Sequence, residues 1–197
     1  METFTEFKPP VDSPLYEAQR DEALKHLDID TIDSPLVGII HGFSELPYCF
    51  TLQSCFGHFV YGNLKDSRNI DPLPRLEPSS RVQYSIAYIA LCIQNGDRGK
   101  LLLEDLKTIP FFDPEYVQFG CAEWFWQTHV NSYVLQVEPI RHKKKDKVSI
   151  SYEEALQVEK VRNKFFNVLE GVVQKRVVKK QLRSQGIKPA FKKTMAE

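Results

Sequence analysis

The side chains most suited to chemistry lie in one short stretch, TLQSCFGH at residues 51–58. It holds two hydroxyls, an amide, a thiol and an imidazole within eight positions. A strand that buries one face needs only alternating apolar residues, so this polar content exceeds what folding requires. The stretch therefore predicts a functional site with three candidate catalytic groups, Ser54, Cys55 and His58.

Cys55 and His58 suit two kinds of chemistry. The imidazole can stabilise the thiolate and make Cys55 a nucleophile. The spacing of the pair also suits a shared zinc ion, with His41, His129 or Glu138 to complete the ligand set. A zinc site usually shows a second close pair of ligands and the sequence has none, so no metal is predicted. The competing interpretation of Cys55 is a small buried apolar side chain.

Gly57 is expected to mark a bend between strands at residues 48–54 and 57–61. At such a bend the hydroxyl of Ser54 and successive backbone N–H groups converge on one point, which suits a carboxylate or a phosphate. The bend also turns Cys55 and His58 to one side. We expect the pair to line a pocket covered by the long loop at residues 62–78.

The segment FTLQSCFGHF at residues 50–59 is similar to the signature TTSSCSGR of the third wybutosine-synthesis protein family. Four residues carry the match: Thr51, Ser54, Cys55 and Gly57. The other positions depart from it, with Leu52, Gln53, Phe56 and His58 where the family has Thr, Ser, Ser and Arg. The resemblance implies a methyltransferase that modifies tRNA with S-adenosylmethionine, or a relative that has lost this activity.

The resemblance also implies where the cofactor lies. S-adenosylmethionine would contact Thr51 and Gly57, and its sulfonium needs an aromatic ring or a carboxylate nearby. Trp124 and Glu138 are the predicted partners, although a core position on the sheet is the competing interpretation of the tryptophan. No GxGxxG motif follows a predicted strand, which argues against an ordinary Rossmann methyltransferase.

Capping residues and apolar periodicity predict the elements that position these groups. Helix starts are expected at both DSPL segments, and strands are expected where apolar and polar residues alternate. The predicted elements beyond the site are helices from 12–15 and 33–36, a helical hairpin at 81–95 and 98–108, strands at 115–126 and 132–140, and a long helix after the capping box of Ser151 and Glu154. The predicted fold class is α+β, with a mixed or antiparallel sheet, a helical hairpin and a long C-terminal helix.

The formal net charge is zero, but the charge is divided along the chain. Residues 1–140 hold 10 Lys and Arg against 20 Asp and Glu, whereas residues 141–197 hold 16 against 6. This asymmetry predicts a globular domain at 1–173 and a basic helix end with a flexible tail at 174–197.

The basic segment suggests an alternative function, which is RNA binding without catalysis. The residues expected to contact phosphates are Lys175, Arg176, Lys179, Lys180 and Arg183. Two other interpretations stay open, namely a solvated tail and a helix that pairs with a second copy of the chain in a homo-oligomer.

The remaining composition bears on the compartment. No run approaches the ~20 apolar residues that span a bilayer, and the first residues show no leader pattern. The four cysteines are scattered and form no CxxC motif, which favours free thiols. We therefore expect a cytoplasmic protein with no membrane partner.

Overall fold

Two antiparallel sheets, joined where the chain bends from one into the other, form the frame of the molecule. The structure is a computed structural model that describes residues 6–62, 66, 68–74, 81–142 and 145–184. The larger sheet has the strand order β1-β4-β6-β5 and the smaller one has the order β2-β3-β7. The strands are β1 (Cys49–Cys55), β2 (His58–Val60), β3 (Val82–Ser85), β4 (Ala87–Ile93), β5 (Val117–Gly120), β6 (Ser132–Val137) and β7 (Lys147–Ile150).

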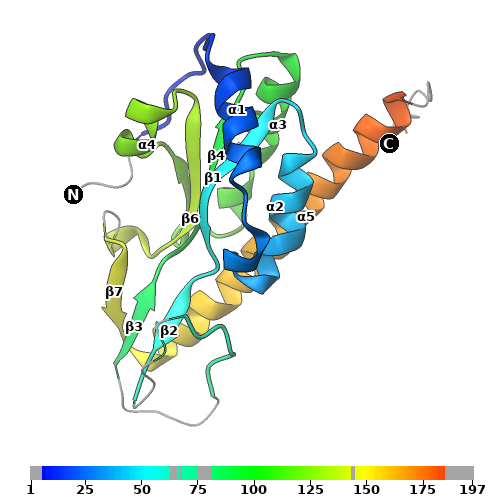
Figure 1. Cartoon of the computed structure of the whole chain (residues 1–197). Coiled ribbons are helices and arrows are strands. Elements are labelled where there is room, and N and C mark those ends of the chain that lie inside the picture. Colours follow the sequence, from blue (N-terminus) through cyan, green and yellow to red (C-terminus); the bar gives the residue numbers. More distant parts are fainter. Residues whose placement is uncertain (1–5, 63–65, 67, 75–80, 143–144, 185–197) are drawn as a thin grey trace, which may run out of the picture.

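The helices cover both faces of the larger sheet. They are α1 (Tyr16–Lys25), α2 (Val37–Ser44), α3 (Asp97–Lys107), α4 (Glu123–Thr128) and α5 (Tyr152–Ser184), with short 3-10 turns η1 (Ile29–Thr31), η2 (Ser34–Leu36), η3 (Ile109–Phe112) and η4 (Ile140–His142). Helices α2 and α5 lie side by side on one side of the sheet, and α4 lies on the other (Figure 1).

The chain passes between the two sheets at two neighbouring bends. Gly57 separates β1 from β2, and Ile86 separates β3 from β4. Because β1 pairs with β4 and β2 pairs with β3, the two bends lie next to each other. Gly57 has a φ of +90°, and a Cβ added to it would lie 2.8 Å from the Cβ of Ala87. The bend therefore requires glycine on two grounds, the backbone conformation and the close approach.

One continuous apolar core joins both sheets to α5. From the larger sheet it includes Ile89 and Leu135, and from the smaller sheet it includes Tyr84 and Ile150. The buried α5 side chains in this core are Tyr152, Ala155, Val158, Val161, Phe165, Phe166, Leu169 and Val173. The helix begins as the sequence predicts, because the backbone N–H of Glu154 donates to the hydroxyl of Ser151 at 3.2 Å.

The α+β class, the antiparallel pairing and the long C-terminal helix are confirmed, but one arm of the predicted helical hairpin is different. Residues 98–108 correspond to helix α3, whereas residues 81–95 form strands β3 and β4. Strand β4 is central in its sheet and buried on both faces, so its apolar residues do not alternate. The spacing of its apolar residues is also compatible with a helix. Its β-branched and aromatic residues favour a strand.

Two other segments differ from the sequence predictions. Strand β5 ends at Gly120, and the aromatic residues that follow form helix α4. Strand β7 lies in a segment for which no strand was predicted. Helix α5 continues past residue 174 to Ser184, which agrees with the basic helix end predicted there, and the predicted flexible tail beyond residue 184 lies outside the described residues. Among the helices of the described ranges, none combines the length and apolar character needed to cross a membrane.

Candidate functional site

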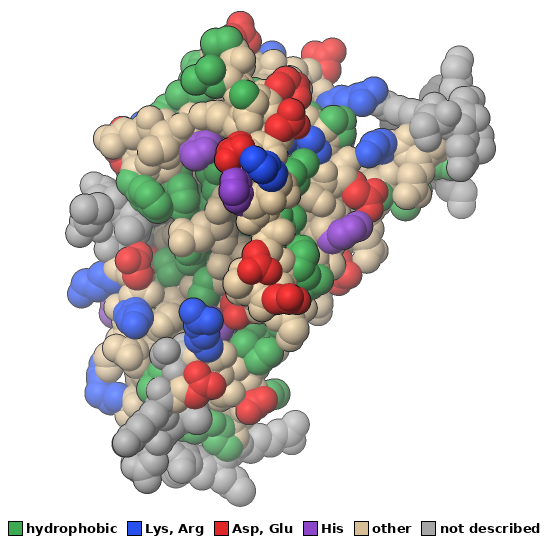
Figure 2. Space-filling view, in the orientation of Figure 1, with side chains coloured by type: hydrophobic (Ala, Val, Ile, Leu, Met, Phe, Trp, Pro, Cys, Tyr) green, Lys and Arg blue, Asp and Glu red, His purple; other side chains and the backbone are tan. Residues whose placement is uncertain are grey.

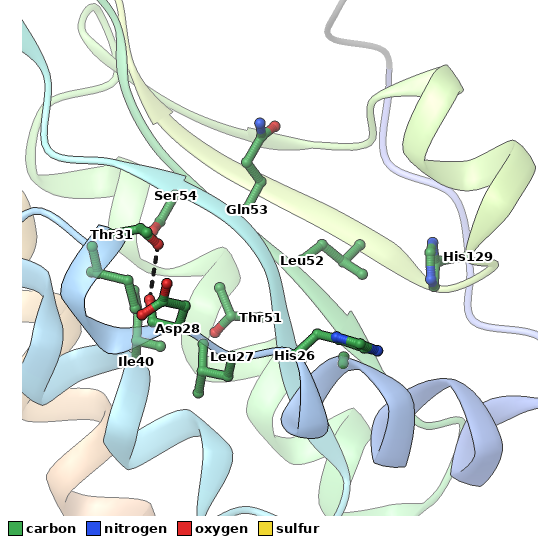
Figure 3. A pocket seen from close by; sticks show the side chains of 12 residues that line it. His26, Leu27, Asp28, Thr31, Ile40, Thr51, Leu52, Gln53, Ser54 and His129 are labelled. Atoms are coloured by element: carbon green, nitrogen blue, oxygen red, sulfur yellow. Dashed lines mark hydrogen bonds between the residues drawn. The ribbon is translucent and has the colours of Figure 1, made fainter.

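A cavity of about 440 Å³ lies beside the edge strand β1, where the predicted site begins. Its size falls in the range of small-molecule sites, which is roughly 300–1,000 Å³. The lining comes from β1, from the end of α1, from η1, from α2 and from the residue after α4: Ala23, His26, Leu27, Asp28, Thr31, Ile32, Ile40, Thr51, Leu52, Gln53, Ser54 and His129. Figure 3 shows Asp28 and Thr31 close to Thr51 and Ser54.

Local irregularity in β1 shapes this cavity. The pairing of β1 with β4 shifts between Thr51 and Gln53, so Leu52 is an extra residue in the strand. Such a bulge re-aims the side chains around it, and all four residues 51–54 contribute to the lining. The hydroxyl of Thr31 donates to the carbonyl oxygen of Asp28 at 2.9 Å (Figure 3). The buried hydroxyl of Thr51 has no hydrogen-bond partner among the described residues, so it can serve a ligand.

Cys55 and His58 lie close together, as predicted, and a third residue joins them. The sulfur of Cys55, a ring nitrogen of His58 and a carboxylate oxygen of Asp33 all lie within 4.8 Å of one another. Nε2 of His58 is 3.3 Å from Oδ2 of Asp33, and Nδ1 of the same ring is 3.3 Å from the carbonyl oxygen of Asn69. Asn69 belongs to the predicted covering loop. His58 is only 7% exposed, so the ring lies beneath the surface and not in an open pocket.

The electrostatics of the cluster follow from these contacts. Hydrogen bonds to Asp33 and then to Cys55 raise the pKa of His58 to about 10, although burial opposes the shift. Burial also acts against ionised Asp33, but hydrogen bonds from His58 and from the backbone N–H of Phe56 hold its pKa below the usual value. At neutral pH the pair is an imidazolium and a carboxylate.

A buried arginine holds the bend between Cys55 and His58. Nη1 of Arg162, on α5, donates to the carbonyl oxygen of Gly57 at 2.9 Å. Its guanidinium lies 4.2 Å from the ring centre of Phe56, and the whole residue is 2% exposed. The backbone N–H of Gly57 in turn donates to the sulfur of Cys55 at 3.4 Å. Arg162 therefore holds the backbone of Gly57 in place, and Gly57 in turn positions the thiol of Cys55.

Sequence reasoning missed both Asp33 and Arg162. Asp33 was interpreted only as part of a helix start, and nothing in the sequence connects it with Cys55. Arg162 did leave a signal, because it follows Val158 by four residues and adjoins Val161 on the apolar face of α5. A charged residue at a buried helical position needs a partner, and here the partner is the backbone of the bend.

Neither Trp124 nor Glu138, the two predicted partners of the sulfonium, lines the cavity at Thr51. Trp124 lies on α4 and is 51% exposed, since the predicted strand becomes a helix at this point. Glu138 follows β6 and is fully buried. Gln136 donates to one of its carboxylate oxygens at 3.1 Å, and burial raises the pKa of Glu138 to about 8. Gly57 lies at the bend beyond the cavity.

The raised pKa of Glu138 predicts a pH dependence of stability. A carboxyl that binds its proton more tightly in the folded state stabilises the fold below the unfolded pKa of about 4.5, and this contribution is lost as the pH rises to about 8. Between pH 5 and pH 8, Glu138→Gln should therefore gain about 2–4 kcal/mol of unfolding free energy relative to the parent protein. Urea denaturation at both pH values measures the difference.

A surface variant serves as the control for this pH dependence. Glu104 is exposed on α3 and pairs with Lys107, so Glu104→Gln should follow the parent profile. Parallel profiles for the parent protein and Glu138→Gln would contradict the assignment.

The predicted RNA-binding residues are not equally available at the end of α5. Arg176 forms an ion pair with Asp105 and donates to the carbonyl oxygen of Leu101 at 2.6 Å, so it fastens α5 to α3. Nζ of Lys180 donates to the carbonyl oxygen of Glu45 at 2.5 Å. Lys175 is exposed and Lys179 is half-buried, while the side chain of Arg183 lies outside the described part of the chain. Figure 2 shows Lys and Arg side chains near this end of α5 and acidic side chains over α1 and α2.

Comparisons with known proteins give similarity in structure only. No protein-family model matches the chain, and no curated protein matches it. The PH1069 protein from Pyrococcus horikoshii is 10% identical with a TM-score of 0.45, over 84% of this chain and 94% of that one. A hypothetical protein from Aeropyrum pernix is 11% identical with a TM-score of 0.41, over 74% of this chain and 98% of that one. A second structure of the PH1069 protein, from Pyrococcus horikoshii OT3, is 9% identical with a TM-score of 0.44, over 86% of this chain and 95% of that one.

Proposed function

We propose that this protein modifies RNA with S-adenosylmethionine, which binds in the cavity beside β1. The observation that carries the proposal is the lining of the cavity by residues 51–54, which belong to the segment similar to the wybutosine-synthesis signature. The signature and the cavity are independent features, one of sequence and one of geometry. Their coincidence favours a ligand site over a chance likeness at four of eight positions.

The polar groups of the cavity suit this cofactor. The carboxylate of Asp28 can accept hydrogen bonds from the ribose hydroxyls or pair with the α-ammonium group. The hydroxyls of Thr51 and Ser54 can bond to the carboxylate end or to the adenine edge. Apolar contact comes from Leu27, Ile32, Ile40 and Leu52. A pocket with an apolar lining and a few converging polar groups is typical of cofactor sites.

The reaction would need little acid–base chemistry from the protein. S-adenosylmethionine supplies a methyl group that an acceptor lone pair attacks as the carbon–sulfur bond breaks and its electrons go to sulfur. The contribution of the chain is then to bind and orient the two reactants. Ser54 and Cys55 are half-buried and continue from the cavity to the bend, so they are the groups that would face the RNA base, whereas His58 lies buried behind them.

The proposed RNA partner has a second source of support in the charge of the chain. The excess of Lys and Arg after residue 140 suits a polyanion. Arg176 and Lys180 donate to backbone carbonyl oxygens of the protein itself, so Lys175 and Lys179 are the residues proposed to contact phosphates. These contacts would hold RNA without reading its sequence.

Binding of S-adenosylmethionine and its demethylated product tests the proposal directly. Isothermal titration of the full chain should show one site, and a hundredfold excess over the dissociation constant should stabilise the fold by about 2.7 kcal/mol in a thermal scan. Thr51→Val removes the unpaired hydroxyl at little cost to the fold and should weaken binding by about tenfold.

The matched control for this titration is Thr108→Val, which changes an exposed threonine at the end of α3, outside the lining. Its affinity for the cofactor should equal that of the parent protein. Absence of both heat and stabilisation at millimolar concentrations of either compound would refute the cofactor assignment.

A further inference from the structure

The cluster at the bend combines three donor atoms that metals of the zinc type prefer. We propose that Asp33, Cys55 and His58 bind a divalent zinc-type ion through a carboxylate oxygen, Sγ and Nε2. The three residues come from the start of η2, the end of β1 and the start of β2. The proposal does not depend on the cofactor assignment, since the proposed cofactor contacts are Asp28, Thr51 and Ser54, which are not ligands of the ion.

The distances suit a tetrahedral ion. Bonds of about 2.0 Å to nitrogen and oxygen and about 2.3 Å to sulfur place the donor atoms roughly 3.3–3.8 Å apart. Nε2 of His58 and Oδ2 of Asp33 are separated by 3.3 Å, and no pair in the cluster exceeds 4.8 Å.

The contacts around the cluster orient the donors for a metal. A carbonyl oxygen can only accept a hydrogen bond, so Nδ1 of His58 keeps the proton directed at Asn69, and a metal ion would displace the proton on Nε2 that faces Asp33. The backbone N–H of Phe56 donates to Asp33 at 2.7 Å, and that of Gly57 donates to the sulfur of Cys55 at 3.4 Å. Such outer contacts support anionic ligands and fix the tautomer of a ligating histidine.

The ligand types select the class of ion. A thiolate disfavours magnesium and calcium, which prefer oxygen ligands alone, and it favours zinc, with cobalt as a usable substitute. Three protein ligands leave a fourth position for water or another ligand. Asp33 and Cys55 are partly exposed, so the ion can enter from solvent. Their sequence neighbours Ile32 and Ser54 line the cavity beside β1, so the cluster lies close to that cavity.

Cobalt titration of the metal-depleted full chain tests the site. One equivalent of Co²⁺ should produce the intense near-ultraviolet absorption of a cobalt–thiolate bond, and Zn²⁺ should abolish it by displacement. Cys55→Ser should remove the band, and Asp33→Asn and His58→Asn should each weaken zinc affinity by about tenfold or more. Cys121→Ser and His41→Asn change the same residue types elsewhere and should leave the titration unchanged.

Zinc protection of the thiol provides a readout that needs no variant. A thiol reagent should label Cys55 in the metal-depleted protein, and one equivalent of Zn²⁺ should suppress this labelling, as resolved by peptide mass spectrometry. The proposal is overturned if Co²⁺ gives no thiolate band or if zinc leaves the labelling of Cys55 unchanged. Neither measurement involves S-adenosylmethionine or RNA, so failure here and failure of the proposed function are distinguishable.

Discussion

Replacing Arg162 with alanine is expected to lower the free energy of unfolding by about 3–5 kcal/mol, a large part of the stability of a domain of this size. The side chain donates to the carbonyl oxygen of Gly57, and its guanidinium lies over the rings of Phe56 and Phe59. Truncation leaves a buried carbonyl without its donor and opens a cavity beneath the bend. Glu159, 3.8 Å away, also loses its cationic neighbour.

Urea denaturation with a matched surface variant measures this effect. Lys160→Ala truncates an exposed cation two residues away on the same helix, and its stability should stay within about 0.5 kcal/mol of the parent value. Arg162→Lys keeps a hydrogen-bond donor but loses the planar group that stacks on the rings. Its free energy of unfolding should therefore lie between those of Arg162→Ala and Lys160→Ala. A loss below about 1 kcal/mol for Arg162→Ala would show that the bend does not depend on this contact.

Gly57→Ala should destabilise the protein by about 2–6 kcal/mol. A φ of +90° is strained for any residue with a Cβ, and this alone costs about 1–3 kcal/mol. The added Cβ would also meet the Cβ of Ala87 at 2.8 Å and its backbone nitrogen at 3.1 Å, and overpacking of this kind costs a further 1–3 kcal/mol or so. Thermal unfolding monitored by circular dichroism measures the combined loss.

The control for Gly57→Ala is a second glycine-to-alanine change that is expected to raise stability instead of lowering it. Gly171 lies within α5 with nothing inside 4 Å of an added Cβ, so Gly171→Ala should stabilise the helix by about 0.5–1 kcal/mol. In a double-mutant cycle, Ala87→Gly should recover part of the loss from Gly57→Ala, because it removes the contact between the two Cβ atoms and leaves the backbone strain. Equal shifts for Gly57→Ala and Gly171→Ala would contradict this account of the bend.

Short-range signals predicted much of the fold. The capping box at Ser151 and Glu154 and the glycine bend at Gly57 depend on neighbours in sequence, and both are present in the structure. Strand β4 was missed because burial on both faces removes the alternation that distinguishes a strand from a helix. A central strand of this kind is specified by its partners β1 and β6, which no local pattern reveals.

The candidate site was predictable to the same extent and for the same reason. Cys55 and His58 are close in sequence, so a bend between them was enough to predict their proximity. Asp33 reaches them only through the packing of η2 against the end of β1, which is a long-range contact. Trp124 and Glu138 were placed with Thr51 from their residue types alone, and the tertiary arrangement separates them from the cavity.

The position of α5 across both sheets has a consequence for how the molecule unfolds. Its 33 residues extend about 50 Å, and its apolar face is part of the one core cluster that contains residues of the larger and the smaller sheet. Neither sheet can therefore lose its tertiary packing while α5 stays in place. The helix makes the two halves a single cooperative unit, so that opening at the small sheet is energetically linked to opening at the far end of the large one.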